Sequence, residues 1–300
     1  MSKPPFLVLP STARAYRLRT ARGEFAVHDA GEPRLGTALL VPGFTGSKED
    51  FIALLDPLAD AGYRVLAVDG RGQYESDGPR NESAYAQNEL AQDLLAVTEA
   101  LRGDSGSSPG TKVHLLGHSL GGLISRAAVM RDAGPFASLT LMSSGPAAVS
   151  AGQQHRLKLL LGALPVMEME EIWQAMLELD PVEAADEHTP PEVADFLHRR
   201  WMAHVPEQLS ATAQQLIAEP DRVAELADAV ADVGSGGSPL PLHVLSGSVD
   251  YAWPVPLLDE MARRLGAART VVEGTGHSPN AEDPRETARA LTSFWDAATS

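Results

Sequence analysis

The residues best suited to chemistry lie in the run 117–122, where Ser119 is flanked by glycines and follows an apolar segment at 112–116. Gly-x-Ser-x-Gly after such a segment is typical of a sharp turn from a strand into a helix, where only glycine fits beside the serine. Such a turn places the serine hydroxyl outside the sheet. Because a serine hydroxyl is a weak nucleophile at its ordinary pKa, catalysis by Ser119 requires a general base and a group that orients that base.

Two candidate partners for Ser119 lie further along the chain, each directly after a predicted strand. His277 follows the last predicted strand, and Asp250 follows the one before it, ahead of a helix predicted to begin near Pro254 or Pro256. Taken alone, an aspartate before proline is more simply a turn residue or a helix cap. The order serine, aspartate, histidine, with each residue at the carboxyl end of a strand, favours a catalytic triad.

Attack on a carbonyl group requires one further element, because it places negative charge on the carbonyl oxygen. Preorganised N–H groups stabilise that charge by roughly 3 to 4 kcal/mol each. We expect one such donor to be the backbone amide of Leu120, directly after the serine. The second should come from the loop Pro-Gly-Phe-Thr-Gly at 42–46, with Phe44 as the predicted donor. The alternative is a plain Pro-Gly turn into the next helix.

The elements that must position these residues are predicted from apolar segments that alternate with amphipathic helical patterns, which is typical of a sheet covered by helices on both faces. The predicted strands are 15–22, 24–29, 37–41, 64–68, 112–116, 138–143, 242–246 and 269–273. The first two should form an antiparallel pair around Gly23. Helix starts are predicted at Ser47, with Asp50 three residues on, and at Asp283, which precedes a proline. The predicted fold class is α/β, with eight strands.

The stretch 146–237 breaks the alternation, because it has helical patterns and no convincing strand. We predict one core in two parts, 1–145 and 238–300, with a helical insertion between them that ends in a flexible linker at 234–238. Two apolar stripes recur in it at helical spacing: Met169, Ile172, Trp173, Met176 and Leu179, then Val193, Phe196, Leu197 and Trp201. They are expected to pack the insertion on itself and on the core, with the lining of a substrate pocket as the alternative.

Composition restricts the kind of partner. The formal net charge of −16 over 300 residues disfavours nucleic acid and anionic membranes, which require a basic face. Since the chain has no cysteine, disulfides, cysteine-ligated metals and thiolate nucleophiles are excluded. His188, His198 and His204 lack metal-ligand spacing, and no metal or other cofactor is expected. The apolar run at 6–9 is too short for a secretory signal or a membrane span, so we expect a cytoplasmic protein with a small-molecule substrate.

Three motifs together resemble those of the α/β-hydrolase fold family, and the resemblance covers nearly the whole chain outside the insertion. Residues 41–44, Val-Pro-Gly-Phe, resemble the family's oxyanion loop, and residues 117–121 match its nucleophile turn. Residues 68–72, Val-Asp-Gly-Arg-Gly, resemble its Asp-x-Arg-Gly turn. The resemblance implies a mostly parallel eight-stranded sheet flanked by helices. It also implies that the insertion 146–237 is a cap that covers the active site and shapes substrate choice.

Two departures from the family pattern are visible. Pro42 stands where many members have histidine, and Gln-Tyr-Glu-Ser at 73–76 replaces the usual glycine-containing stretch. Neither departure removes a catalytic group, and Asp69 and Arg71 are expected to have a structural role in their turn. The Ser-His-Asp constellation is therefore expected to be intact.

The resemblance implies acyl transfer through Ser119, with hydrolysis of a carboxylic ester of a small, largely apolar molecule as the first expectation. Serine at the turn argues against the family's epoxide hydrolases and haloalkane dehalogenases, which are built around an aspartate. Hydrolysis of carbon–carbon bonds, hydrolysis of thioesters and cofactor-free haloperoxidase-type activity use similar sites and are alternatives. A non-catalytic small-molecule receptor of the same fold is an alternative of another class.

Overall fold

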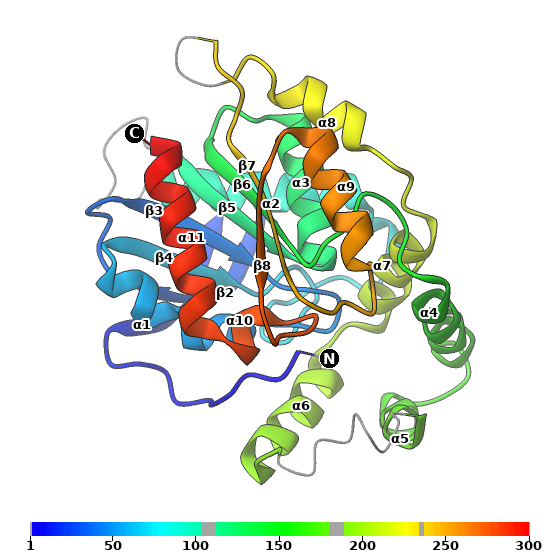
Figure 1. The fold of residues 1–300 in the computed structure, drawn as a ribbon. Helices are drawn as coiled ribbons and strands as arrows, with labels where there is room; N and C mark the ends of the chain where they lie inside the picture. Colours follow the sequence, from blue (N-terminus) through cyan, green and yellow to red (C-terminus); the bar gives the residue numbers. More distant parts are fainter. Residues whose placement is uncertain (1, 104–111, 180–188, 234–236, 300) are drawn as a thin grey trace.

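One eight-stranded sheet organises the chain in a computed structural model that describes residues 2–103, 112–179, 189–233 and 237–299 (Figure 1). His188, residues 105–110 and residues 234–236 of the predicted linker lie outside the described residues. The strands are β1 (Ala13–Thr20), β2 (Gly23–Ala30), β3 (Gly36–Val41), β4 (Tyr63–Val68), β5 (Val113–His118), β6 (Phe136–Met142), β7 (Leu242–Gly247) and β8 (Ala268–Val272). Each predicted strand overlaps an observed one, so the predicted fold class is confirmed.

The strand order is β1-β2-β4-β3-β5-β6-β7-β8. β2 pairs antiparallel with both β1 and β4, whereas every other neighbouring pair is parallel. The predicted antiparallel opening pair is therefore present. Because β5, β7 and β8 run in the same direction, the residues that follow them lie at one edge of the sheet.

Helices cover both faces of the sheet, and the side-chain alternation of β3 shows why two layers are needed. Leu39 and Val41 belong to one buried apolar cluster, and Ala38 and Leu40 belong to a second cluster on the opposite face. The first cluster includes side chains of α2 (Gln87–Arg102), α3 (Leu120–Arg131) and α9 (Val255–Leu265). The second includes side chains of α1 (Ile52–Asp60) and α11 (Pro284–Thr299).

Both predicted helix starts are observed. A short 3-10 helix, η1 (Lys48–Phe51), begins after Ser47, and the Asp50 carboxylate accepts the backbone N–H of Ser47 at 3.3 Å. α11 begins at Pro284, directly after Asp283, and is preceded by the short helix α10 (Pro279–Glu282). A second 3-10 helix, η2 (Glu82–Tyr85), precedes α2. Within the described residues, none of the helices has the length and apolar character needed to cross a bilayer.

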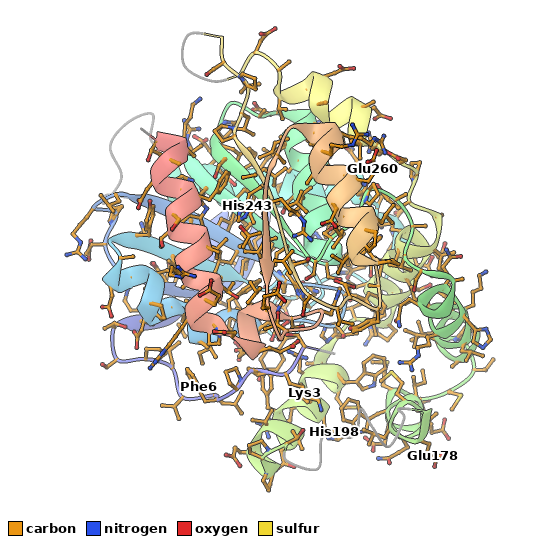
Figure 2. The ribbon with its side chains drawn as sticks, viewed as in Figure 1. Lys3, Phe6, Glu178, His198, His243 and Glu260 are labelled. Atoms are coloured by element: carbon orange, nitrogen blue, oxygen red, sulfur yellow. The ribbon has the colours of Figure 1, made fainter. Side chains whose placement is uncertain are left out.

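Between β6 and β7 the described residues form helices only: α4 (Ala151–Ala163), α5 (Met169–Leu179), α6 (Pro191–Ala203), α7 (Pro206–Ala218) and α8 (Val223–Val230). α4, α5 and α6 extend away from the sheet, and Figure 2 shows His198 and Glu178 among them, far from His243 of β7. The two predicted stripes meet in a buried cluster, here called the cap cluster: Leu160, Ile172, Trp173, Val193, Phe196, Leu197, Trp201 and Leu209. The apolar side chains of α8 join the core of the sheet, as do Leu157 of α4 and Ala213 and Leu216 of α7. The division at 146–237 stays a prediction.

Candidate active site

Ser119 lies at the turn from β5 into α3, in a backbone conformation that few non-glycine residues adopt. Its φ is 54° and its ψ is −121°, and the residue is 9% exposed. A conformation of this kind costs about 1–3 kcal/mol and persists only where the surrounding structure imposes it. A Cβ atom on Gly117 would collide with the Gly121 carbonyl, and one on Gly121 would collide with the Val41 carbonyl. The glycines therefore allow the Ser119 turn to pack tightly against β3.

His277 and Asp250 meet at the same edge of the sheet, in the loops that follow β8 and β7. The distance from His277 Nδ1 to Asp250 Oδ2 is 2.9 Å. The other carboxylate oxygen, Oδ1, accepts the backbone N–H groups of Ala252 at 2.7 Å and Trp253 at 3.0 Å. Asp250 thus caps its own turn, as the simpler interpretation predicts, and at the same time binds the His277 ring.

Aromatic rings surround the imidazole of His277. The centroid of its ring lies 4.7 Å from that of Tyr251 and 5.0 Å from that of His118. His118 Nε2 donates to the backbone carbonyl of His277 at 2.8 Å, which ties the turn of Ser119 to the loop of His277. Burial lowers the pKa of His118 to about 3, so this ring is neutral and only weakly basic. Within the described residues no hydrogen bond joins Ser119 Oγ to His277, a bond that in many hydrolases tightens only with substrate.

The predicted oxyanion loop lies directly against the serine. A Cβ atom built on Gly43 would lie 3.2 Å from Ser119 Cβ. The peptide N–H of Phe44, the next residue, therefore belongs to a peptide group beside the serine. Leu120 occupies the first position of α3, where an N–H group has no acceptor within the helix. The structure thus brings the loops of all five predicted site residues together.

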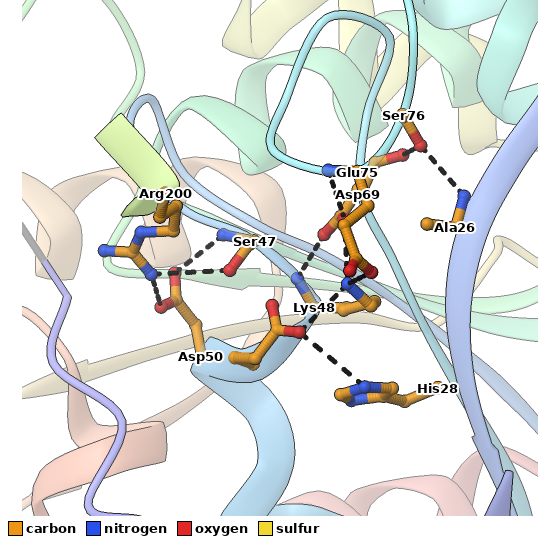
Figure 3. Close-up of polar contacts among 10 residues, drawn as sticks. Ala26, His28, Ser47, Lys48, Asp50, Asp69, Glu75, Ser76 and Arg200 are labelled. Atoms are coloured by element: carbon orange, nitrogen blue, oxygen red, sulfur yellow. Dashed lines mark hydrogen bonds and ion pairs between the residues drawn. The ribbon is translucent and has the colours of Figure 1, made fainter. Parts of the chain in front are cut away.

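A cluster of charged side chains around Lys48, just after this loop in the sequence, was not predicted (Figure 3). Lys48 is 1% exposed, and its Nζ lies 3.0 Å from Asp69, 2.6 Å from Glu75 and 2.9 Å from Glu49. Although burial alone would lower the pKa of Lys48, the carboxylates of Asp69 and Glu49 raise it, so the ammonium is retained. Burial raises the pKa of Asp69 to about 7. Among the described residues, no group of three or more His, Asp or Glu side chains is arranged to hold a metal ion.

α6 is attached to the same loops by a second buried ion pair. Arg200 Nη1 lies 2.6 Å from Asp50, and both side chains are fully buried (Figure 3). The backbone N–H of Val205, just after α6, donates to the Gly72 carbonyl at 2.9 Å. The N-terminal segment also reaches α6, because Arg200 donates to the Ser2 carbonyl at 2.9 Å. α6 is therefore attached both to η1, which follows the oxyanion loop, and to the turn 69–76.

Tyr74 lies in the stretch 73–76 that departs from the family pattern, and its backbone has the left-handed conformation that favours glycine, with φ at 40°. Its ring lies 4.8 Å from Lys48 Nζ and 5.5 Å, edge-on, from the ring of Phe196 in α6. In the same turn, the Arg71 guanidinium donates to the Asp93 carboxylate of α2 at 2.6 Å. The turn 69–76 thus contacts the oxyanion loop, the sheet-covering helix α2 and the cap cluster.

A comparison with known families gives the context for this geometry. The model of the Alpha/beta hydrolase family matches residues 38–290. The chain belongs to the alpha/beta hydrolase family. Among curated members, the chain is 33% identical over 127 residues to the 2-hydroxy-6-oxononadienedioate/2-hydroxy-6-oxononatrienedioate hydrolase of Klebsiella pneumoniae, covering 41% of each protein. It is 27% identical over 130 residues to the proline iminopeptidase of Lacticaseibacillus rhamnosus, covering 42% of each. These matches span less than half the length of either relative.

Solved structures of alpha/beta hydrolases resemble the fold over nearly the whole chain. A thermophilic esterase from Thermogutta terrifontis superposes with a TM-score of 0.73 at 22% identity and covers 96% of this chain and 100% of the esterase. E-2-(Acetamidomethylene)succinate hydrolase superposes with a TM-score of 0.68 at 20% identity and covers 95% of this chain and 99% of that one. At such identities the likeness establishes the alpha/beta hydrolase fold and leaves the substrate to be argued from the site.

Proposed function

We propose that this protein is a serine hydrolase that cleaves a carboxylic ester, or a related acyl bond, of a small and largely apolar molecule. The observation that carries the proposal is the strained backbone of Ser119 at the start of α3, on the same sheet edge as the hydrogen-bonded pair His277–Asp250. Strain of this kind in a residue that bears a nucleophile is typical of active sites. A structural serine at a helix start has no need of it.

In the proposed first step, Ser119 Oγ attacks the carbonyl carbon of the substrate and transfers its proton to His277 Nε2. This nitrogen is free to accept it because Nδ1–H donates to Asp250, which fixes the tautomer and stabilises the imidazolium that forms. The N–H groups of Phe44 and Leu120 bind the oxyanion of the tetrahedral intermediate. The intermediate collapses when His277 returns the proton to the leaving alcohol, which leaves an acyl group on Ser119.

Water completes the cycle by the reverse sequence. His277 takes a proton from the water as its oxygen attacks the acyl carbon, and the same two N–H groups bind the second oxyanion. The bond to Ser119 then breaks, the serine regains its proton from His277, and the carboxylic acid leaves. No step requires a metal or an organic cofactor, since base, nucleophile and oxyanion donors all come from this chain.

The apolar character of the proposed substrate follows from the surroundings of the oxyanion loop. The half-buried ring of Phe44 packs against the cap cluster, as do Met169 and Met176. Methionine side chains adapt to irregular apolar shapes. The net charge of −16 offers no long-range attraction to anionic molecules. We therefore propose an uncharged acyl or alcohol group on the cap side of the serine.

Hydrolysis of a carbon–carbon bond beside a ketone is the second candidate. It is supported by the 33% identity over 127 residues with the Klebsiella pneumoniae hydrolase of 2-hydroxy-6-oxo compounds. The two candidates differ in substrate and share the nucleophile. A panel that contains nitrophenyl esters, a thioester and a vinylogous diketone separates them by rate.

Replacement of Ser119 by alanine tests the proposal. We expect the Ser119→Ala variant to lose more than about 10⁴-fold in kcat on short nitrophenyl esters and to resist labelling by a fluorophosphonate probe. Ser125→Ala, a fully buried serine in the same helix α3, is the matched control and should retain both. Retained esterase activity in purified Ser119→Ala contradicts the proposal. Tight binding of a ligand by a wild type that shows neither turnover nor labelling would instead establish a receptor.

A further inference from the structure

The side chain of Gln73 uses both ends of its amide group to join two loops. Its Nε2 donates to the Gly43 carbonyl at 2.8 Å and to the Phe44 carbonyl at 3.3 Å. Its Oε1 accepts the backbone N–H of Gly70 at 3.0 Å. The residue is 6% exposed, so these bonds are shielded from water. A buried amide satisfied in this way has one orientation.

The bond to Gly43 has a stereochemical consequence for the next residue. The Gly43 carbonyl and the Phe44 N–H belong to the same peptide group, and the described residues contain no cis peptide bond. In a trans peptide the C=O and N–H groups point in opposite directions. A carbonyl held toward Gln73 therefore directs the Phe44 N–H away from Gln73. Gly46 N–H donates to the same carbonyl at 3.2 Å and favours the same orientation.

The geometry points to Gln73 as a positioning residue that sets the direction of the Phe44 N–H and thereby preorganises one half of the oxyanion hole. The inference rests on the proposed function, since it concerns the oxyanion of the same reaction. Gln73 acts through the Gly43–Phe44 peptide and is not itself assigned a contact with the reacting atoms. It acts on a loop that lies against Ser119, where a peptide free to rotate would stabilise the transition state less well.

The test compares Gln73→Met with Gln208→Met. Methionine keeps the length of glutamine and removes its donors. Gln208, at 2% exposure, donates to Thr212 within its own helix α7 and provides a matched buried glutamine. For Gln73→Met we expect kcat on a nitrophenyl ester to fall about 10- to 100-fold while KM changes less than about twofold, because the interaction acts in the transition state. Gln208→Met should retain kcat within about twofold.

A second variant keeps the test valid if Gln73→Met folds poorly. Gln73→Glu retains the acceptor toward Gly70 and, when ionised, lacks the donor toward Gly43, so it should show the same fall in kcat. Crystal structures of the variants give a readout that does not depend on activity. A rotated Gly43–Phe44 peptide in either variant supports the inference.

Two outcomes are distinguishable by these measurements. An unchanged peptide in a folded variant whose kcat stays within about twofold of the wild type overturns the role of Gln73. A wild type that neither hydrolyses any ester nor reacts with a fluorophosphonate overturns the proposed function. In that case the crystal structures still decide whether Gln73 orients the peptide.

Discussion

The two sides of Ser119 are supported in different ways. On the side of the proposed acid–base pair, here called the acid–base side, Asp250 is held by backbone N–H groups two and three residues further along the chain, at 2.7 and 3.0 Å. On the oxyanion side, the loop of Gly43 is held by the side chain of Gln73, which lies 30 residues away in the sequence. The first support is local backbone geometry, and the second is a tertiary contact between a polar side chain and a backbone carbonyl group. Loss of the Asp250 carboxylate should lower the rate of hydrolysis, whereas loss of the ion pairs of Lys48, next to the second support, should lower the stability of the fold.

The largest expected effect breaks the acid–base side. Asp250→Asn retains the shape of the side chain and an oxygen for the turn, but it no longer holds His277 Nδ1 as a donor to a carboxylate. We expect kcat to fall about 10⁴-fold, with a change in unfolding free energy below about 1 kcal/mol. Ester hydrolysis and urea unfolding of the same preparation measure the two quantities. A fall in kcat below tenfold would show that Asp250 only caps its turn.

The next largest effect is expected when the ion pairs of Lys48, on the oxyanion side, are removed. Lys48→Met leaves the buried carboxylates of Asp69 and Glu49 without their cation, so we expect unfolding to become easier by about 3–5 kcal/mol. The double variant Lys48→Met, Asp69→Asn should recover part of this loss, because one of the uncompensated charges is gone. Urea unfolding of the wild type and the three variants of the cycle measures both. If the changes in unfolding free energy of the two single variants simply add up to that of the double variant, Lys48 and Asp69 do not stabilise each other.

The smallest expected effect is a pH dependence of the unfolding free energy, to which one histidine on each side of the site contributes. Burial lowers the pKa of His118, on the acid–base side, to about 3 and that of His28, beside Glu49, to about 4, against an ordinary value of 6.5. As the pH falls below about 6.5, these histidines bind protons in the unfolded chain before they do so in the folded protein. The free energy of unfolding is therefore highest above about pH 6.5 and decreases until the pH reaches the folded-state pKa. Each of the two histidines should lower the free energy of unfolding by about 2 kcal/mol at pH 5 relative to pH 7.

Urea unfolding of His118→Gln and His28→Gln between pH 7 and pH 5 checks this expectation. Each substitution should reduce the slope of unfolding free energy against pH by a similar amount, although the two residues lie on different sides of the site. Three further buried histidines, His114, His204 and His243, have pKa values lowered to about 4 and should keep the remaining slope of the same sign. Identical slopes in the wild type and both variants would contradict the assignment of buried neutral rings.

The sequence predicts the fold well, and it predicts which loops meet around Ser119, because both depend on strand patterns that are visible in short segments. Strand periodicity locates the ends of β5, β7 and β8, and parallel topology then brings Ser119, Asp250 and His277 to one edge. Their catalytic roles stay predictions until the variants are measured. The structure adds that Asp250 satisfies the capping interpretation as well, which the sequence presents as an alternative.

The oxyanion-side supports were not predicted, for a physical reason. Lysine and arginine are almost never fully buried unless they are paired, and the pairing partners lie far away along the chain. Asp50 and Arg200 are separated by 150 residues, and nothing local to either indicates the other. Gln73 and Tyr74 stand in a visible departure from the family pattern. That departure was the available signal, but a pattern says only that the residues differ, not what they contact.

The attachment of α6 has a consequence for exchange of parts between relatives. Arg200 binds Asp50, Val205 binds Gly72 and Phe196 contacts Tyr74, so these contacts join α6 and its end to η1 and to the turn 69–76. A helical insertion transplanted from another hydrolase would therefore leave Asp50 as an unpaired buried acid and Tyr74 without its aromatic neighbour. The helical region around α6 is not an interchangeable module: a graft has to carry residues 47–50 and 72–76 with it.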